Sequence, residues 1–177
     1  RGLAREMQLS DNEQRDIYIA ALLHDIGKIG LSDHALFTPI AELDGDSRAA
    51  LMKHPAKGQT ALMGLSELQA AGRIIRHHHE RFDGQGFPDG LLKATIPVAS
   101  RILAVAEDYD ELQQGWLAAK KLTEAEALEF VMGASGKRYD PDVLAHLPAA
   151  LEKLRAAPRE EEKLLEVSDL KPGMVVM

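Results

Sequence analysis

Residues 10–28 read SDNEQRDIYIAALLHDIGK, and this stretch predicts a long helix that faces the protein core. Its apolar residues recur every three to four positions, as they do on one face of an α-helix. Ser10, followed three residues later by Glu13, is the capping-box pattern that begins a helix. We therefore expect a helix over roughly 11–27, with His24 and Asp25 near its C-terminal end and Lys28 about one turn later.

Similar spacing and capping patterns recur along the chain and predict an all-α domain. Ala and Leu are abundant, and aromatic residues make up only 5% of the sequence, which also favours helices. The other expected helices are one capped by Asp46 or Ser47, one from Pro55 to Met63, one over about 67–79, one from Pro97 through Leu112, and two near 124–134 and 141–155.

The composition excludes several classes of protein. With 177 residues, 45% of them apolar and 28% charged, the chain can bury one core. The absence of cysteine excludes disulfides and thiolate zinc sites, so any metal must be held by His, Asp or Glu. A net charge of −7 argues against binding long nucleic acid, and no apolar run reaches the length of a membrane span. We expect a cytoplasmic protein.

The chain divides into two parts of different character. Residues 1–158 form the helical domain, and Leu3 and Met7 look like the end of a helix that starts upstream, so we expect a piece of a longer protein. Residues 159–177 hold a charged linker and then short apolar segments around a turn. We expect this second part to be the start of a small β module.

Four groups of residues could carry chemistry. His24-Asp25 and the run His77 to His79 offer imidazoles and a carboxylate that could bind metal, although a core histidine or a polar helix end would give the same patterns. The loop Asp83 to Gly90 contains three glycines, which let a backbone approach a ligand closely, but a surface turn would look similar. Glu107 follows an apolar run and is expected to face inward, while Asp110 and Glu111 are expected to be solvated.

Together, three motifs resemble those of the HD-GYP family of bacterial phosphohydrolases. They are His24-Asp25-Ile26-Gly27-Lys28, His54-Pro55-Ala56-Lys57-Gly58 and His78-His79-Glu80-Arg81-Phe82-Asp83-Gly84-Gln85-Gly86-Phe87-Pro88. With the stretches 96–112 and 136–141, the resemblance covers roughly residues 1–147. It implies an HD-superfamily helical bundle over 1–158 that hydrolyses cyclic di-GMP to pGpG, GMP or both.

The resemblance also implies roles for individual residues. Asp25 would bridge two metals and Lys28 would contact substrate phosphate, so we expect both to be catalytic. Arg81 and Arg101 are further candidates for phosphate or base contacts, with an ordinary ion pair as the alternative for each. The expected metal ligands are His24, Asp25, His54, His78, His79 and Glu107, and the expected substrate contacts are Lys28, Arg81, Gly84, Gly86 and Arg101.

Physical chemistry makes a two-metal site plausible for this reaction. Two divalent ions can supply an activated hydroxide near neutral pH and stabilise both the attacking and the leaving oxygen of a phosphodiester. His and carboxylate ligands without thiolate are compatible with iron, manganese, zinc and nickel, and the ligand list alone does not choose among them. We favour iron or manganese. The residues that bind a third metal in some family members would precede residue 1, so two metals are expected here.

The chain departs from the family pattern at three places. Phe87 stands where the family name has Tyr, which keeps the ring and loses the hydroxyl. Glu107 stands where the family usually has an Asp ligand, and Asp108 could substitute for it. After this helix, the family's Arg-Pro-Tyr-Arg stretch is replaced by residues 115–121, which read GWLAAKK.

These departures leave three functional hypotheses. The first is a metal-dependent cyclic di-GMP phosphodiesterase. The second is a degenerate signalling module that binds metal or ligand and acts through contacts with proteins such as diguanylate cyclases. The third is an HD phosphohydrolase for another nucleotide.

Overall fold

The computed structural model describes residues 2–38, 42–117 and 120–156. Within them the chain is helical, without β-strands, and only two isolated bridges pair Asp83 with Leu92 and Ser135 with Tyr139. The α-helices are α1 (Gly2–Glu6), α2 (Asp11–Leu23), α3 (Asp33–Phe37), α4 (Gly45–Leu51), α5 (His54–Leu62), α6 (Gln69–Arg76), α7 (Val98–Gln114), α8 (Glu124–Gly133) and α9 (Pro141–Ala156). Three short 3-10 helices are η1 (Ile26–Lys28), η2 (Ser66–Leu68) and η3 (Lys93–Thr95).

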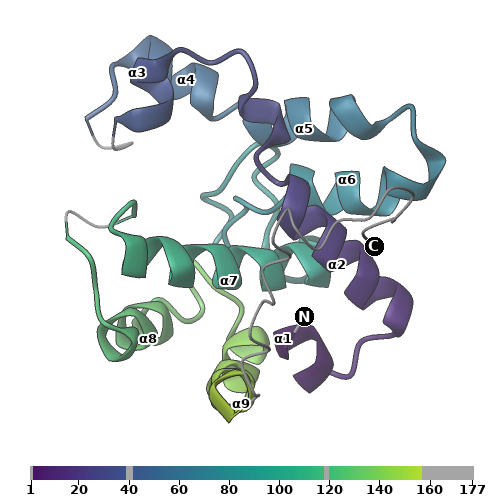
Figure 1. Ribbon diagram of the computed structural model, residues 1–177, viewed down its shortest axis with the longest axis vertical. Helices are drawn as coiled ribbons and strands as arrows, with labels where there is room; N and C mark the ends of the chain where they lie inside the picture. Colours follow the sequence, from purple (N-terminus) through teal and green to yellow (C-terminus); the bar gives the residue numbers. More distant parts are fainter. Residues whose placement is uncertain (1, 39–41, 118–119, 157–177) are drawn as a thin grey trace, which may run out of the picture.

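The helices pack around α7, which crosses the middle of the molecule in Figure 1. Helices α2, α6, α8 and α9 all contact α7, α5 packs beside α6, and α3 and α4 contact each other. The core holds the apolar faces of these helices, for example Ile17 of α2, Ile75 of α6 and Val105 of α7. The all-α prediction is confirmed. None of the helices in the described segments is long and apolar enough to cross a membrane.

Most predicted helices are present, and two capping boxes are confirmed. The Ser10 and Glu13 side chains close the N-terminus of α2, and those of Thr123 and Glu126 close the N-terminus of α8. The cap of α4 was predicted wrongly, because Asp44, not Asp46 or Ser47, accepts the hydrogen bond from the backbone amide of Ser47. The predicted linker and β module at 159–177 lie outside the described residues.

Two helices end earlier than their sequences predict, and both ends carry histidine. The helix predicted over 11–27 ends at Leu23, and the one predicted over 67–79 ends at Arg76 after beginning with a 3-10 turn. Beyond the first of these ends, Gly27 packs directly on α5: an added Cβ would lie 1.9 Å from the carbonyl oxygen of His54.

Candidate metal centre

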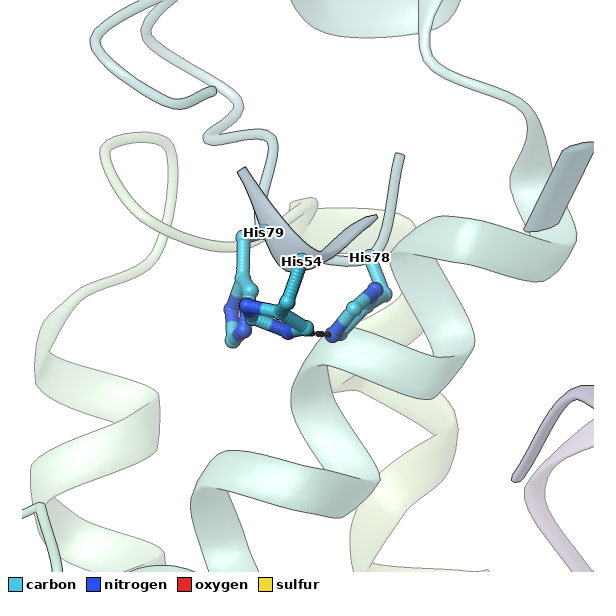
Figure 2. A group of neighbouring side chains, drawn as sticks. All are labelled: His54, His78 and His79. Carbon is cyan, nitrogen blue, oxygen red and sulfur yellow. Dashed lines mark hydrogen bonds between the residues drawn. The ribbon is translucent and has the colours of Figure 1, made fainter. Parts of the chain in front are cut away.

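Six side chains from four segments converge at the centre of the fold. His24 and Asp25 follow α2, His54 begins α5, His78 and His79 follow α6, and Glu107 lies on α7. Their ligand atoms form two groups, each with all atoms within 4.8 Å of one another: His54 with His78 and His79, and His24 with Asp25 and Glu107. Figure 2 shows the rings of the first group turned toward one another. The structure brings together all six predicted ligands.

Short distances join the two groups into one cluster. His54 Nε2 lies 3.4 Å from His78 Nε2 and 3.7 Å from Asp25 Oδ1. Glu107 Oε2 lies 3.7 Å from His78 Nε2, and Glu107 Oε1 lies 3.7 Å from His24 Nε2 and 3.9 Å from His79 Nε2. These distances are longer than those of a strong hydrogen bond. Imidazole nitrogens and carboxylate oxygens at such distances from one another can bind the same cation.

Three of the imidazoles are oriented by the same local device. Each ring donates from Nδ1 to the backbone carbonyl three residues earlier: His24 to Ala21 at 2.8 Å, His54 to Leu51 at 2.7 Å and His78 to Ile75 at 2.5 Å. A proton on Nδ1 leaves the lone pair on Nε2, which faces the cluster, and this arrangement is typical of metal-bound histidine. Because each carbonyl lies at a helix end or just before a helix, the early helix ends serve the site.

Burial keeps these rings in the neutral form that binds metal. It lowers the pKa of His54 to about 4 and that of His78 to about 3, and it lowers the pKa of His79 well below its ordinary value. Burial removes water from around a charged imidazole and so costs free energy, whereas the neutral ring is buried at much lower cost. Near neutral pH these three imidazoles therefore need lose no proton to accept a cation.

The carboxylates carry the clearest sign that a cation belongs here. Both carboxyl oxygens of Glu107 and Oδ1 of Asp25 are buried without a hydrogen-bond partner in the part of the chain that the structure describes. The Glu107 side chain is only 6% exposed, and burial raises its pKa well above the ordinary value. Buried acceptors left unpaired are costly, and a metal ion is a partner that removes this cost. The donor set therefore fits divalent metal.

Lys28 lies at the edge of the cluster. Its Nζ donates to Asp25 Oδ2 at 2.8 Å, while Asp25 Oδ1 faces the histidines. Burial by itself would raise the pKa of Asp25, but the Lys28 hydrogen bond and the neighbouring histidines lower it below its ordinary value. Lys28 thus holds Asp25 ionised and places a positive charge beside the candidate metals.

The glycine-containing loop after His79 is held against the cluster. Phe87 packs on His79 with ring centroids 4.9 Å apart, and the backbone amide of Phe87 donates to the His79 carbonyl at 3.2 Å. Glu80 is buried and accepts from the amides of Asp89 at 2.7 Å and Leu91 at 3.0 Å, so it fastens the loop. At Gly86 an added Cβ would lie 2.2 Å from the amide nitrogen of Arg81, so only glycine fits.

The two arginines predicted to contact substrate are already engaged within the protein. Arg81 forms two hydrogen bonds to Asp83, at 3.0 and 2.6 Å. Arg101 bonds to the carboxylate of Asp140 and donates to the carbonyl of Ile96 at 2.9 Å. Their substrate contacts stay predictions, as do those of Gly84 and Gly86.

Helix α7 corrects two expectations. Asp108 does not substitute for Glu107, because its buried carboxylate accepts hydrogen bonds from Arg138 at 2.6 and 2.9 Å and from Tyr139 at 2.8 Å. Glu111, expected to be solvated, is half-buried, and burial raises its pKa to about 7. Sequence reasoning missed Glu111 although its spacing of four residues from Glu107 places both on one helix face.

The remaining histidines lie apart from the cluster. His34 is exposed and lies 3.3 Å from Asp44, and His146 bonds to the carbonyl of Asp142 in α9. His77 lies instead beside Asp89, with 3.4 Å between Nδ1 and the carboxylate oxygen.

Known proteins are similar to this chain in sequence. The HD domain family matches residues 1–143. The cyclic di-GMP phosphodiesterase response regulator RpfG of Xanthomonas campestris is 36% identical over 157 residues, which make up 86% of this chain and 41% of that protein. The 3'3'-cGAMP-specific phosphodiesterase 3 of Vibrio cholerae is 33% identical over 169 residues, 94% of this chain and 35% of that protein.

A solved structure is also similar. Bd1817, described as an HDG"Y"P protein from Bdellovibrio bacteriovorus, superposes with a TM-score of 0.67 at 25% identity, over 85% of this chain and 48% of that one. The chain thus spans less than half the length of each of these three proteins.

Proposed function

The chain belongs to the HD domain family and is of its HD-GYP type, and from this premise we propose that it hydrolyses a cyclic dinucleotide in a metal-dependent reaction. The proposed substrate is cyclic di-GMP, and the proposed product is pGpG, GMP or both. One observation carries the proposal: the unpartnered, buried oxygens of Asp25 and Glu107 face the Nε2 atoms of four histidines. Without cations, these buried oxygens would have no partner among the described residues to offset the cost of their burial.

The cluster suits two divalent ions, with iron or manganese favoured and zinc or nickel also compatible. His54, His78 and His79 would hold one ion, and His24 and Glu107 the other. Asp25 Oδ1 lies 3.6 Å from His24 Nε2 and 3.7 Å from His54 Nε2. Asp25 could therefore be a ligand of both ions. When bound, such ions supply a nucleophile from water near neutral pH and offset negative charge on a phosphodiester.

The chain's own residues would orient the substrate and the ligands. Lys28 Nζ is hydrogen-bonded to Asp25 in this structure. It can also donate to a phosphate oxygen and hold the scissile phosphate beside the cluster. The Nδ1 bonds of His24, His54 and His78 fix the ring planes, so the site is organised before substrate arrives. Phe87 packs against the His79 ring and so supports its position.

Two of the three departures from the family pattern, Phe87 and Glu107, are compatible with this function. Phe87 keeps its packing on His79, which needs a ring and no hydroxyl. Glu107 reaches the histidines of both groups, so the longer side chain preserves the ligand. This opposes a degenerate module that acts only through partners such as diguanylate cyclases. Partner binding and the cytoplasmic location stay predictions.

A second candidate substrate is 3'3'-cGAMP, because a relative covering 94% of this chain is named for that activity. It would use the same cluster and Lys28, since the scissile bond is of the same kind. The two substrates differ in one base, so base recognition decides between them.

The test is turnover by the full chain loaded anaerobically with Fe(II) or Mn(II), with products separated by chromatography. We expect linear products from the wild type, and less bound metal and no turnover in a variant carrying His24→Ala and Asp25→Ala. A matched control, His34→Ala with His146→Ala, should keep both metal and activity. Absence of turnover with any of the four metals, in protein whose metal content is confirmed, would overturn the enzyme proposal.

A further inference from the structure

The C-terminal end of α7 carries two side chains that the chemistry above does not use. Glu111 lies one helical turn beyond Glu107 on the same face, and its half-buried carboxyl makes no hydrogen bond or ion pair with the residues that the structure describes. Trp116 follows the helix, is the single tryptophan of the chain, and is 52% exposed. The half-buried carboxyl and the exposed indole are both available to contact a ligand.

The backbone holds these two residues together. Gly115 ends α7 in the left-handed conformation, at φ +85°. The amides of Gly115 and Trp116 both donate to the Glu111 carbonyl, at 2.9 and 3.0 Å. Counting 1.5 Å per residue, Glu111 and Gly115 lie about 6 and 12 Å along the axis from Glu107. A dinucleotide with its phosphate at the cluster can therefore reach both side chains.

The charges of Glu111 and of the cluster influence one another. Besides burial, the charges of Asp108 on its own helix, of Lys28 and Asp25 in the turn after α2, and of Arg138 before α9 affect the pKa of Glu111. Glu111 in turn raises the pKa of Glu107, after the larger effect of burial. Along α7, Glu111 lies one helical turn beyond Glu107, toward the end of the helix that Trp116 follows.

We propose that this end of α7 recognises a guanine base of the substrate, with Trp116 stacking on the base and Glu111 accepting hydrogen bonds from its N1–H and N2–H groups. This inference rests on the proposed cyclic dinucleotide substrate. Stacking on an aromatic ring tolerates any base, because every base has a π-face. In its ionised form the Glu111 carboxyl only accepts hydrogen bonds, so that form selects guanine, which offers two donors, against adenine, which offers a lone pair at N1.

The proposal has a consequence specific to 3'3'-cGAMP. This molecule holds one guanine and one adenine, so its two phosphodiester bonds are not equivalent. If Glu111 selects guanine, the molecule binds in one orientation, and one of the two bonds faces the cluster. The protein would then produce a single linear isomer, and cyclic di-AMP, which has no guanine, would be a poor substrate.

The experiment measures kcat/KM for cyclic di-GMP and cyclic di-AMP, and the isomers formed from 3'3'-cGAMP, with the Mn(II)-loaded full chain. Glu111→Gln should lower the preference for cyclic di-GMP over cyclic di-AMP at least tenfold and yield both isomers, since a good bidentate contact discriminates by about that much. Trp116→Ala should raise KM for cyclic di-GMP about tenfold, and Trp116→Phe should restore it. Exposed residues of α8 give matched controls, Glu129→Gln and Phe130→Ala.

A second readout is independent of turnover. A phosphorothioate analogue of cyclic di-GMP, which resists hydrolysis, should change the fluorescence of Trp116 saturably, because no other tryptophan contributes. Turnover by the wild type with an unchanged base preference in Glu111→Gln, or an equal loss for all substrates, would overturn the inference and leave the proposed function standing. Fluorescence of Trp116 that does not change when the analogue is added would also overturn the inference and leave the proposed function standing. No turnover of any cyclic dinucleotide by the wild type would instead refute the proposed function.

Discussion

Replacing Glu107 by methionine should stabilise the metal-free protein and greatly reduce its stabilisation by metal. The substitution removes two buried oxygens that have no hydrogen-bond partner among the described residues and keeps a flexible apolar side chain of similar length. Each unsatisfied buried acceptor costs about 1–3 kcal/mol, so two cost about 2–6 kcal/mol. We expect a gain of about 2 kcal/mol, at the low end of this range, because burial raises the pKa of Glu107 and so favours its uncharged form, which is less costly to bury.

Urea unfolding with EDTA and with saturating Mn(II) measures both effects. The wild type should gain about 2.7 kcal/mol at a metal concentration one hundred times the dissociation constant, whereas Glu107→Met should gain far less. Glu129→Met, at an exposed position of α8, is the matched control and should stay within about 0.5 kcal/mol of the wild type in both conditions. Lower stability of Glu107→Met in EDTA, or an undiminished response to Mn(II), would refute the reasoning that Glu107 is kept for metal.

Three further predictions concern the neighbours of Glu107. Lys28→Ala should retain its metal, measured by elemental analysis, but lose about a hundredfold in kcat/KM, because the charge beside the phosphate is removed; equal loss of metal would point to a structural role. The EDTA-treated protein should melt at lower temperature as pH falls from 6.5 toward 4, because the lowered pKa values of His54 and His78 mean that the unfolded state binds more protons in that range; a flat calorimetric profile would contradict this. Gly27→Ala should destabilise the protein by about 3 kcal/mol or more in urea unfolding, because its Cβ would meet the His54 carbonyl at 1.9 Å; near wild-type stability would contradict the close approach.

The sequence predicted the helices and the six clustered side chains well, for identifiable reasons. Capping boxes such as Ser10 with Glu13 act within one turn, so local sequence determines them. The ligand positions came from motif order, which requires no knowledge of the packing. The structure adds the donor orientation, because the Nδ1 bonds of His24, His54 and His78 depend on the path of the backbone.

The predictions that were wrong concern helix ends and side-chain burial, which depend on tertiary packing or on the face of the helix that a residue occupies. The predicted helices ending at 27 and 79 stop at Leu23 and Arg76, and at the first of these ends the packing of Gly27 on α5 cannot be seen in apolar periodicity. On α7, both Asp108 and Glu111 differ from expectation: Asp108 is paired with Arg138, and Glu111 is half-buried instead of solvated. Asp108 is buried by Arg138, which is distant in sequence, whereas Glu111 could have been placed from its spacing to Glu107.

The most direct test of the central claim is the fate of solvent oxygen during turnover. The metal-loaded protein would be incubated with cyclic di-GMP in water enriched in ¹⁸O, and the linear product analysed by mass spectrometry. The account predicts pGpG with one heavy oxygen in its terminal phosphate, formed by the wild type and not by Glu107→Met. Unchanged cyclic di-GMP with metal demonstrably bound, or a linear product without heavy oxygen, would contradict it.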